Sequence, residues 1–95
     1  MTRADILARR HQIIALGKRY GASRFRLFGS MARGDAGESS DIDFIVRFEP
    51  HRSLLDHGGL VMDLRELLGV RVDVIDEDAM RPRFRDHVMK EAITL

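Results

Sequence analysis

Two aspartates, Asp41 and Asp43, lie one residue apart in the apolar run "DIDFIV" (residues 41–46). In a strand, residues two apart project from the same face, here roughly 7 Å apart along the backbone. Two carboxylates at that separation repel each other, and a hard divalent cation removes this cost. Mg²⁺ is typically held by one or two carboxylates together with phosphate oxygens of a substrate. The pair therefore indicates a two-metal site, in which one ion activates an attacking oxygen and the other stabilises the leaving one.

A second motif, Gly29-Ser30, precedes Asp41 by ten intervening residues. It follows a predicted strand and opens a predicted short helix. Glycine lets the backbone approach a phosphate, and a helix start presents free N–H groups to an anion. The Ser30 hydroxyl adds a hydrogen bond, and Arg33, one turn later, is suited to bidentate contact with phosphate. These residues predict a phosphoryl- or nucleotidyl-transfer site, although a turn glycine, an N-cap serine and a surface arginine are the plain structural alternatives.

A third carboxylate is expected on a neighbouring strand, and Asp73 in "RVDVI" (residues 71–75) fits. Val72 and Val74 occupy the opposite face of that strand. We expect Asp73 to join the ligands of the catalytic metal and to act as the base for the attacking hydroxyl. An exposed aspartate on an edge strand is the structural alternative.

The apolar spacing predicts how the chain positions these residues. Helices are expected over 3–19, after an N-cap at Ser53 as far as Gly69, and from Pro82 onward. Strands are expected over 24–28, 41–48 and 70–75. "DAGESS" (35–40) reads as a turn exposed to solvent. The predicted fold class is therefore α/β (α+β): a small mixed sheet of about three strands, with flanking helices mainly on one face and the metal site on the open face near the strand ends.

The predicted core includes side chains of the later helices. The last helix is expected to bury Phe84, Val88 and Leu95, and Met62 is expected to fill the core. The four histidines are scattered without ligand spacing, which argues against a histidine metal site.

Composition narrows the function classes. The chain has 95 residues, so we expect a single domain over 1–95. A net charge of +1 gives no reason to expect a membrane or direct nucleic-acid partner. There is no cysteine, no signal-peptide pattern and no apolar run of the roughly 18 residues that a spanning helix needs. We expect a cytoplasmic protein.

The spacing of Gly29-Ser30 from Asp41-Ile42-Asp43 resembles the signature of the DNA polymerase beta-like nucleotidyltransferase superfamily. The chain as a whole is most similar to its minimal nucleotidyltransferases, also through "LRELLGVRVDVI" and the closing "VMKEAITL". The resemblance implies that Gly29 and Ser30 contact nucleotide phosphates. It also implies that Asp41, Asp43 and Asp73 bind two Mg²⁺ ions.

The resemblance further implies an antitoxin that transfers AMP from ATP to a tyrosine of a partner HEPN-domain RNase toxin. Larger superfamily members carry extra domains that position the acceptor, so we expect this acceptor to arrive on a partner protein. Two alternatives stay open: an antitoxin that acts by binding alone, and a transferase acting on a small molecule such as an aminoglycoside. The sequence does not decide whether the chain forms a homo-oligomer.

Overall fold

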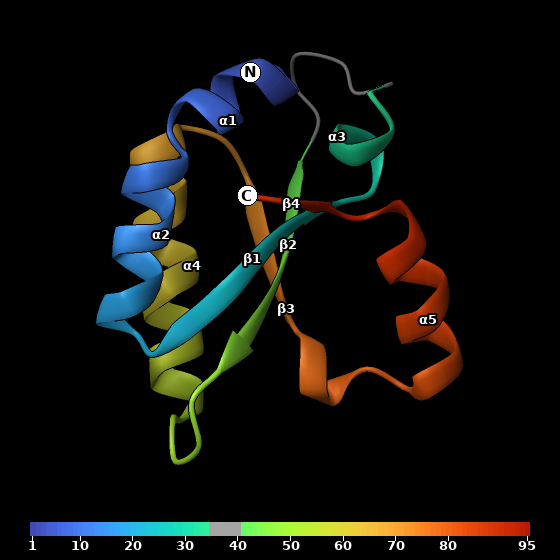
Figure 1. Ribbon diagram of the computed structural model, residues 1–95. Coiled ribbons are helices and arrows are strands. Elements are labelled where there is room, and N and C mark those ends of the chain that lie inside the picture. The colour runs from blue at the N-terminus through green and yellow to red at the C-terminus, as the bar shows by residue number, and fades with distance from the viewer. Residues whose placement is uncertain (35–40) are drawn as a thin grey trace.

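The computed structural model describes residues 1–34 and 41–95, whose helices and strands are shown in Figure 1. In chain order the elements are α1 (Arg3–Ala8), α2 (Arg10–Arg19), β1 (Ala22–Phe28), α3 (Ser30–Arg33), β2 (Ile42–Phe48), α4 (Leu54–Leu68), β3 (Val72–Asp76), the 3-10 helix η1 (Glu77–Ala79), α5 (Pro82–Glu91) and β4 (Ile93–Thr94). The predicted turn over 35–40 lies outside the described residues. Within the described ranges, no helix has the length and apolar character needed to cross a membrane.

Four strands form one sheet in the order β3-β2-β1-β4. β2 runs parallel to β3 and antiparallel to β1, and α4 is the crossover that the parallel pair needs. The predicted mixed sheet with flanking helices is confirmed, but three strands was one too few. The missed strand is β4, in which Ile93 pairs with Leu27, so Leu95 does not extend the last helix. A strand of two residues is too short to show an alternating pattern.

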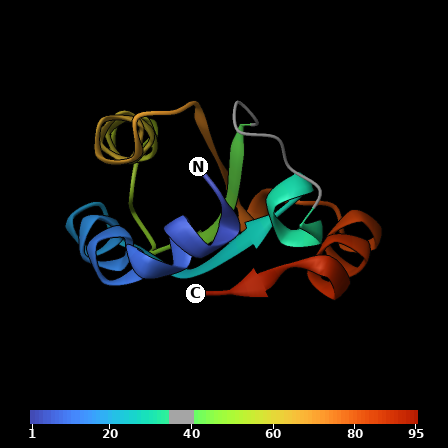
Figure 2. The same ribbon diagram turned by 90° about the horizontal axis from the view of Figure 1, so that it is seen from above.

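The main hydrophobic core lies between the sheet and the helices α2 and α4, which Figure 2 shows together on one side. Alternation along β2 places Ile42, Phe44 and Val46 in this core, all fully buried. Leu60 and Leu64 of α4 supply part of the facing apolar stripe and are also fully buried. The other face of the sheet carries Asp43 and Arg47 of β2, together with Ile45, which is fully buried.

α5 lies on the opposite side of the sheet from α2 and α4 (Figure 2), so the helices are not confined to one face. Val88 is fully buried, as predicted, but Phe84 is 49% exposed, with its ring edge-on to Phe28. Met62 was also placed wrongly, because it is 71% exposed on α4. Helical spacing identifies an apolar stripe but does not assign every apolar side chain to the buried side.

The predicted helix over 3–19 is two helices, because Arg9 interrupts it with φ −103° and ψ 11°. Thr2 and Asp5 form a capping box at its start. The Arg9 guanidinium donates to the carbonyl oxygen of Leu67 at 2.9 Å, where a cation complements the C-terminal end of α4. Neither glycine nor proline lies at the break, so the local sequence does not predict it.

Candidate active site

Three residues on three neighbouring strands form a row across the sheet, on the face opposite the main core. Phe28, the last residue of β1, pairs with Asp43 of β2, and Asp43 pairs with Asp73 of β3. Residues paired across neighbouring strands point to the same face. Because Ile42 and Val72 point into the core, Asp43 and Asp73 point away from it. The structure thus brings together two predicted carboxylates that are far apart in the chain.

The predicted aspartates interact electrostatically around Asp43. Asp43 is half-buried, whereas Asp41 and Asp73 are exposed. Burial raises the pKa of the Asp43 carboxyl, and repulsion from Asp73 and then from Asp41 raises it further. Asp41 lies one residue before the first residue of β2, whereas the sequence predicted it to lie within this strand. The three aspartates therefore form one acidic group at the ends of β2 and β3.

Gly29 lies directly against this acidic group. It joins β1 to α3 with φ 73° and ψ −146°, a conformation that essentially only glycine adopts. A Cβ at this position would lie 3.0 Å from Oδ2 of Asp43. Glycine is therefore required by the backbone conformation, and a side chain at this position would crowd the Asp43 carboxylate.

Ser30 and Arg33 are the first and last residues of α3. Ser30 is half-buried, and Arg33 is exposed with Nη1 3.9 Å from Oε2 of Glu91 on α5. Their contacts with phosphate stay predictions. Arg3, which the sequence did not single out, donates to the carbonyl oxygen of Ala32 at 3.0 Å and so ties α3 to α1.

Arg65 of α4 is a second residue that the sequence did not single out. Its Nη2 lies 3.6 Å from Oδ1 of Asp73, and its Nε donates to the carbonyl oxygen of Val72 at 3.1 Å. Both contacts cross from the helix to the outer edge of β3. The only local signal is a cation in the last turn of a helix, which is common for dipole reasons alone.

A divalent cation fits this group by charge and by donor type. The predicted ligands are all carboxylate oxygens, which suit Mg²⁺. The repulsion at half-buried Asp43 is the cost that a cation beside Asp43 and Asp73 would remove. Over residues 1–34 and 41–95, however, no three acidic or histidine side chains already converge closely enough to hold a metal. The carboxylates therefore suit a cation by charge and donor type, but they are not already arranged around one.

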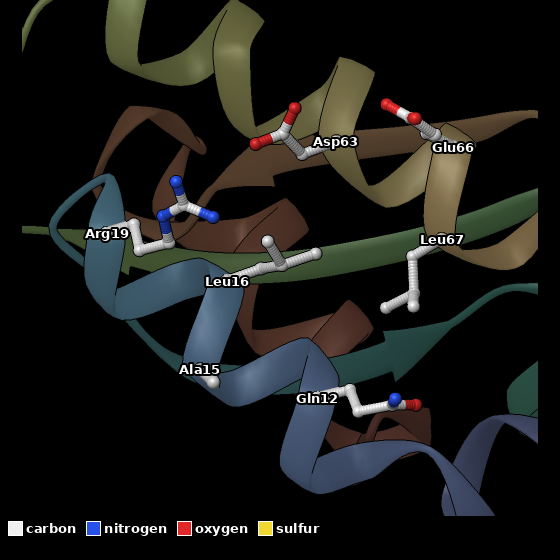
Figure 3. A pocket seen from close by; sticks show the side chains of 7 residues that line it. All are labelled: Gln12, Ala15, Leu16, Arg19, Asp63, Glu66 and Leu67. Atoms are coloured by element: carbon white, nitrogen blue, oxygen red, sulfur yellow. The ribbon is translucent and has the colours of Figure 1, made fainter.

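A groove of about 620 Å³ lies elsewhere, between α2 and α4 (Figure 3). It is lined by Gln12, Ala15, Leu16, Arg19, Asp63, Glu66 and Leu67. Arg19 of α2 lies across the groove from Asp63 and Glu66 of α4. None of the predicted site residues lines it, so the groove and the acidic group are separate features.

Residues 10–95 match the nucleotidyltransferase domain family. The chain belongs to this family and is a nucleotidyltransferase. The resemblance to minimal nucleotidyltransferases, inferred from the Gly-Ser and aspartate motifs, is confirmed.

Individual relatives agree with this assignment. A Methanocaldococcus jannaschii protein, assigned as protein adenylyltransferase MJ0435, is 38% identical over 88% of this chain and 90% of its own length. Protein adenylyltransferase MntA of Thermococcus cleftensis is 37% identical over 82% of this chain and 79% of its own. A solved structure described as a minimal nucleotidyltransferase superposes with a TM-score of 0.90 at 49% identity, covering 100% of this chain and 97% of that one. A toxin–antitoxin crystal structure with AMP-PNP shares the fold, with a TM-score of 0.75 at 23% identity, over 88% of this chain and 69% of that one.

Proposed function

We propose that this nucleotidyltransferase transfers AMP from ATP, with Mg²⁺, to a tyrosine hydroxyl of a partner HEPN-domain RNase toxin and so acts as its antitoxin. Two contacts carry the proposal: Gly29 lies against Asp43, and Asp43 pairs with Asp73 across β2 and β3. A protein acceptor is supported by relatives named protein adenylyltransferase. A toxin as the partner is supported by the similar fold in a toxin–antitoxin complex.

In the proposed reaction, the acceptor oxygen attacks the α-phosphorus of ATP, the bond from that phosphorus to the bridging oxygen breaks, and pyrophosphate leaves. Gly29 and Ser30 bind the triphosphate, because the absence of a Cβ lets the backbone approach phosphate oxygens. Arg33 contributes positive charge to the same phosphates.

The carboxylates would hold the metal ions. Asp41 and Asp43 would hold one ion, and Asp73 would complete the site of a second ion. When bound, the two ions would neutralise phosphate charge and stabilise the attacking and leaving oxygens. Asp73 would accept the proton that the acceptor hydroxyl loses. We place the reaction in the cytoplasm, because a chain without cysteine has no disulfides that would require an oxidising environment.

The test is label transfer to the protein encoded by the gene next to this one. The two purified proteins are incubated with Mg²⁺ and ATP labelled with ³²P at either the α- or the γ-phosphate. The proposal predicts protein-bound label from α-labelled ATP only, lost in Asp43→Asn and retained in Asp78→Asn, an exposed aspartate of η1. A stable complex that silences the partner without label would instead establish an antitoxin that acts by binding alone.

A further inference from the structure

Four residues on the outer side of α4 form an exposed surface, the α4 stripe: Leu54, Leu55, Gly58 and Met62. Leu54 and Leu55 are each 87% exposed, and Met62 is 71% exposed. Leu55 and Met62 are two helical turns apart and so lie on the same side of the helix. Large apolar side chains gathered in this way on one surface are typical of an interaction site.

Gly58 strengthens this interpretation. At the neighbouring residue, Gly59, packing within the protein explains the glycine, because a Cβ there would lie 2.5 Å from Cε1 of Tyr20. A Cβ on Gly58 would meet nothing within 4 Å. Glycine inside a helix costs about 1 kcal/mol relative to alanine, and at Gly58 no contact among residues 1–34 and 41–95 requires it. What glycine provides there is bare helix backbone that another molecule can approach closely.

The α4 stripe lies close to Asp73 of the acidic group. Arg65, about one turn beyond Met62, reaches both the carbonyl oxygen of Val72 and the carboxylate of Asp73. At a rise of about 1.5 Å per residue, the path from Leu54 to Arg65 is about 16 Å long. A partner that covers the α4 stripe therefore lies next to Asp73.

The order of the strands shows from which side an acceptor must come. Gly29 follows β1, Asp43 lies on β2 and Asp73 lies on β3, which is the edge of the sheet. In an in-line displacement, the attacking oxygen is opposite the leaving pyrophosphate. With the triphosphate at Gly29, the acceptor approaches past Asp73, over the edge that α4 flanks.

Strand addition at this edge is obstructed by α4. Nε2 of His57 lies 2.7 Å from the carbonyl oxygen of Val74, and Nε of Arg65 donates to the carbonyl oxygen of Val72. Because these carbonyl oxygens already have partners, an added strand could not use them. The surface that remains for an acceptor protein on this side is the outer face of α4.

We propose that the α4 stripe is the docking surface for the acceptor protein, which presents its hydroxyl to Asp73 while an apolar patch of its own covers Leu54, Leu55 and Met62. The inference rests on the proposed function for the statement that the acceptor is a protein. It adds the surface and the direction of approach.

The test measures label transfer from α-³²P-ATP to the product of the neighbouring gene over a range of that protein's concentration. The variants are Leu55→Lys and Met62→Lys, and the matched control is His11→Lys, which places the same charge at an exposed position on α2. The stripe variants should raise the KM for the partner at least about tenfold, as loss of a central apolar contact does, with kcat within twofold of wild type. The thermal shift produced by ATP with Mg²⁺ should not change, which shows that the variants are folded and bind nucleotide.

A KM within twofold of wild type in both stripe variants would overturn the docking surface while leaving the transferase intact. If the wild type transfers no label but binds the partner, and Met62→Lys weakens that complex, the docking surface stands and adenylylation fails. If sedimentation shows a wild-type dimer that Met62→Lys dissociates, with no effect on the partner, the surface joins two copies of this chain and the proposal is wrong.

Discussion

Asp43 and Asp73 are direct register partners in the parallel pair of β2 and β3, so their carboxylates lie side by side on the face away from the core. Burial, together with this neighbour, raises the pKa of the Asp43 carboxyl. Without a cation, the folded chain therefore carries ionised Asp43 at a cost in stability. Electrostatic cost concentrated at a few groups is typical of functional sites.

Asp43→Asn should raise the melting temperature of the metal-free protein at neutral pH. A carboxyl whose pKa is raised in the folded state stabilises the fold below its ordinary value of 3.8 and loses that contribution as pH rises through the raised value. The advantage of Asp43→Asn should therefore shrink as pH falls toward 3.8. Thermal melts from neutral pH down to 3.8 test the sign of this change in melting temperature, with Asp78→Asn as the control. A variant that melts below wild type at neutral pH would contradict it.

The parts of this fold that the sequence predicted are those with strong local patterns. The alternation in β2 and the N-cap at Ser53 appear in the structure as expected, and Asp56 completes a capping box with Ser53. The break at Arg9 and the short strand β4 depend on contacts with distant elements. A single chain segment does not contain that information, so local pattern alone could not supply them.

The same distinction holds for the site. Asp41 and Asp43 were predicted from spacing within one strand, and Asp73 from the alternation of its own strand. Their proximity depends on β3 lying beside β2, which the structure shows. Arg65 could not be predicted, because its contact with Asp73 requires α4 to pack along the outer edge of β3.

Gly29→Ala should destabilise the fold by about 1 to 3 kcal/mol, the usual cost of a side chain in this backbone region. Its Cβ would also press on Oδ2 of Asp43 at 3.0 Å, so transfer activity should fall more than the loss of folded protein explains. Gly69→Ala is the matched control, since Gly69 also has positive φ, at 69°, but open space around its Cβ. Urea denaturation and label transfer on both variants check this. Equal activity in the two variants would remove Gly29 from the site.

Glu77→Ala should cost about 1.5 to 3 kcal/mol in the free energy of unfolding, the range expected for hydrogen bonds to a charged group. Glu77 is 2% exposed, and its Oε1 lies 2.9 Å from Nη1 of Arg26 and 3.5 Å from Nη2 of Arg85. These contacts tie η1 and α5 to β1. As control, Asp78→Ala breaks the exposed ion pair with Arg47 and should cost less than about 1 kcal/mol. Equal losses in the free energy of unfolding for the two variants, measured by urea denaturation, would show that the buried contacts of Glu77 stabilise the fold no more than the exposed ion pair does.

Arg65→Gln should lower the Mg²⁺ concentration that gives half of the maximal thermal shift. Arg65 lies 3.6 Å from the carboxylate of Asp73 and competes with a cation for it. An exposed ion pair of this kind accounts for about a 1.5- to fivefold change. Arg71→Gln removes a charge from an exposed residue near Asp73 and controls for the general loss of positive charge. An equal change in both variants would assign the effect to overall charge instead.

In the proposed reaction, Gly29, Asp43 and Asp73 hold the triphosphate and the metal. The most direct test is a crystal structure with Mn²⁺ and an ATP analogue whose α–β bridge is a methylene, located by the anomalous signal of manganese. The proposed function predicts manganese in contact with Asp43 and Asp73, and phosphates against Gly29 and Ser30. Metal and nucleotide bound elsewhere, for example in the groove between α2 and α4, would contradict it.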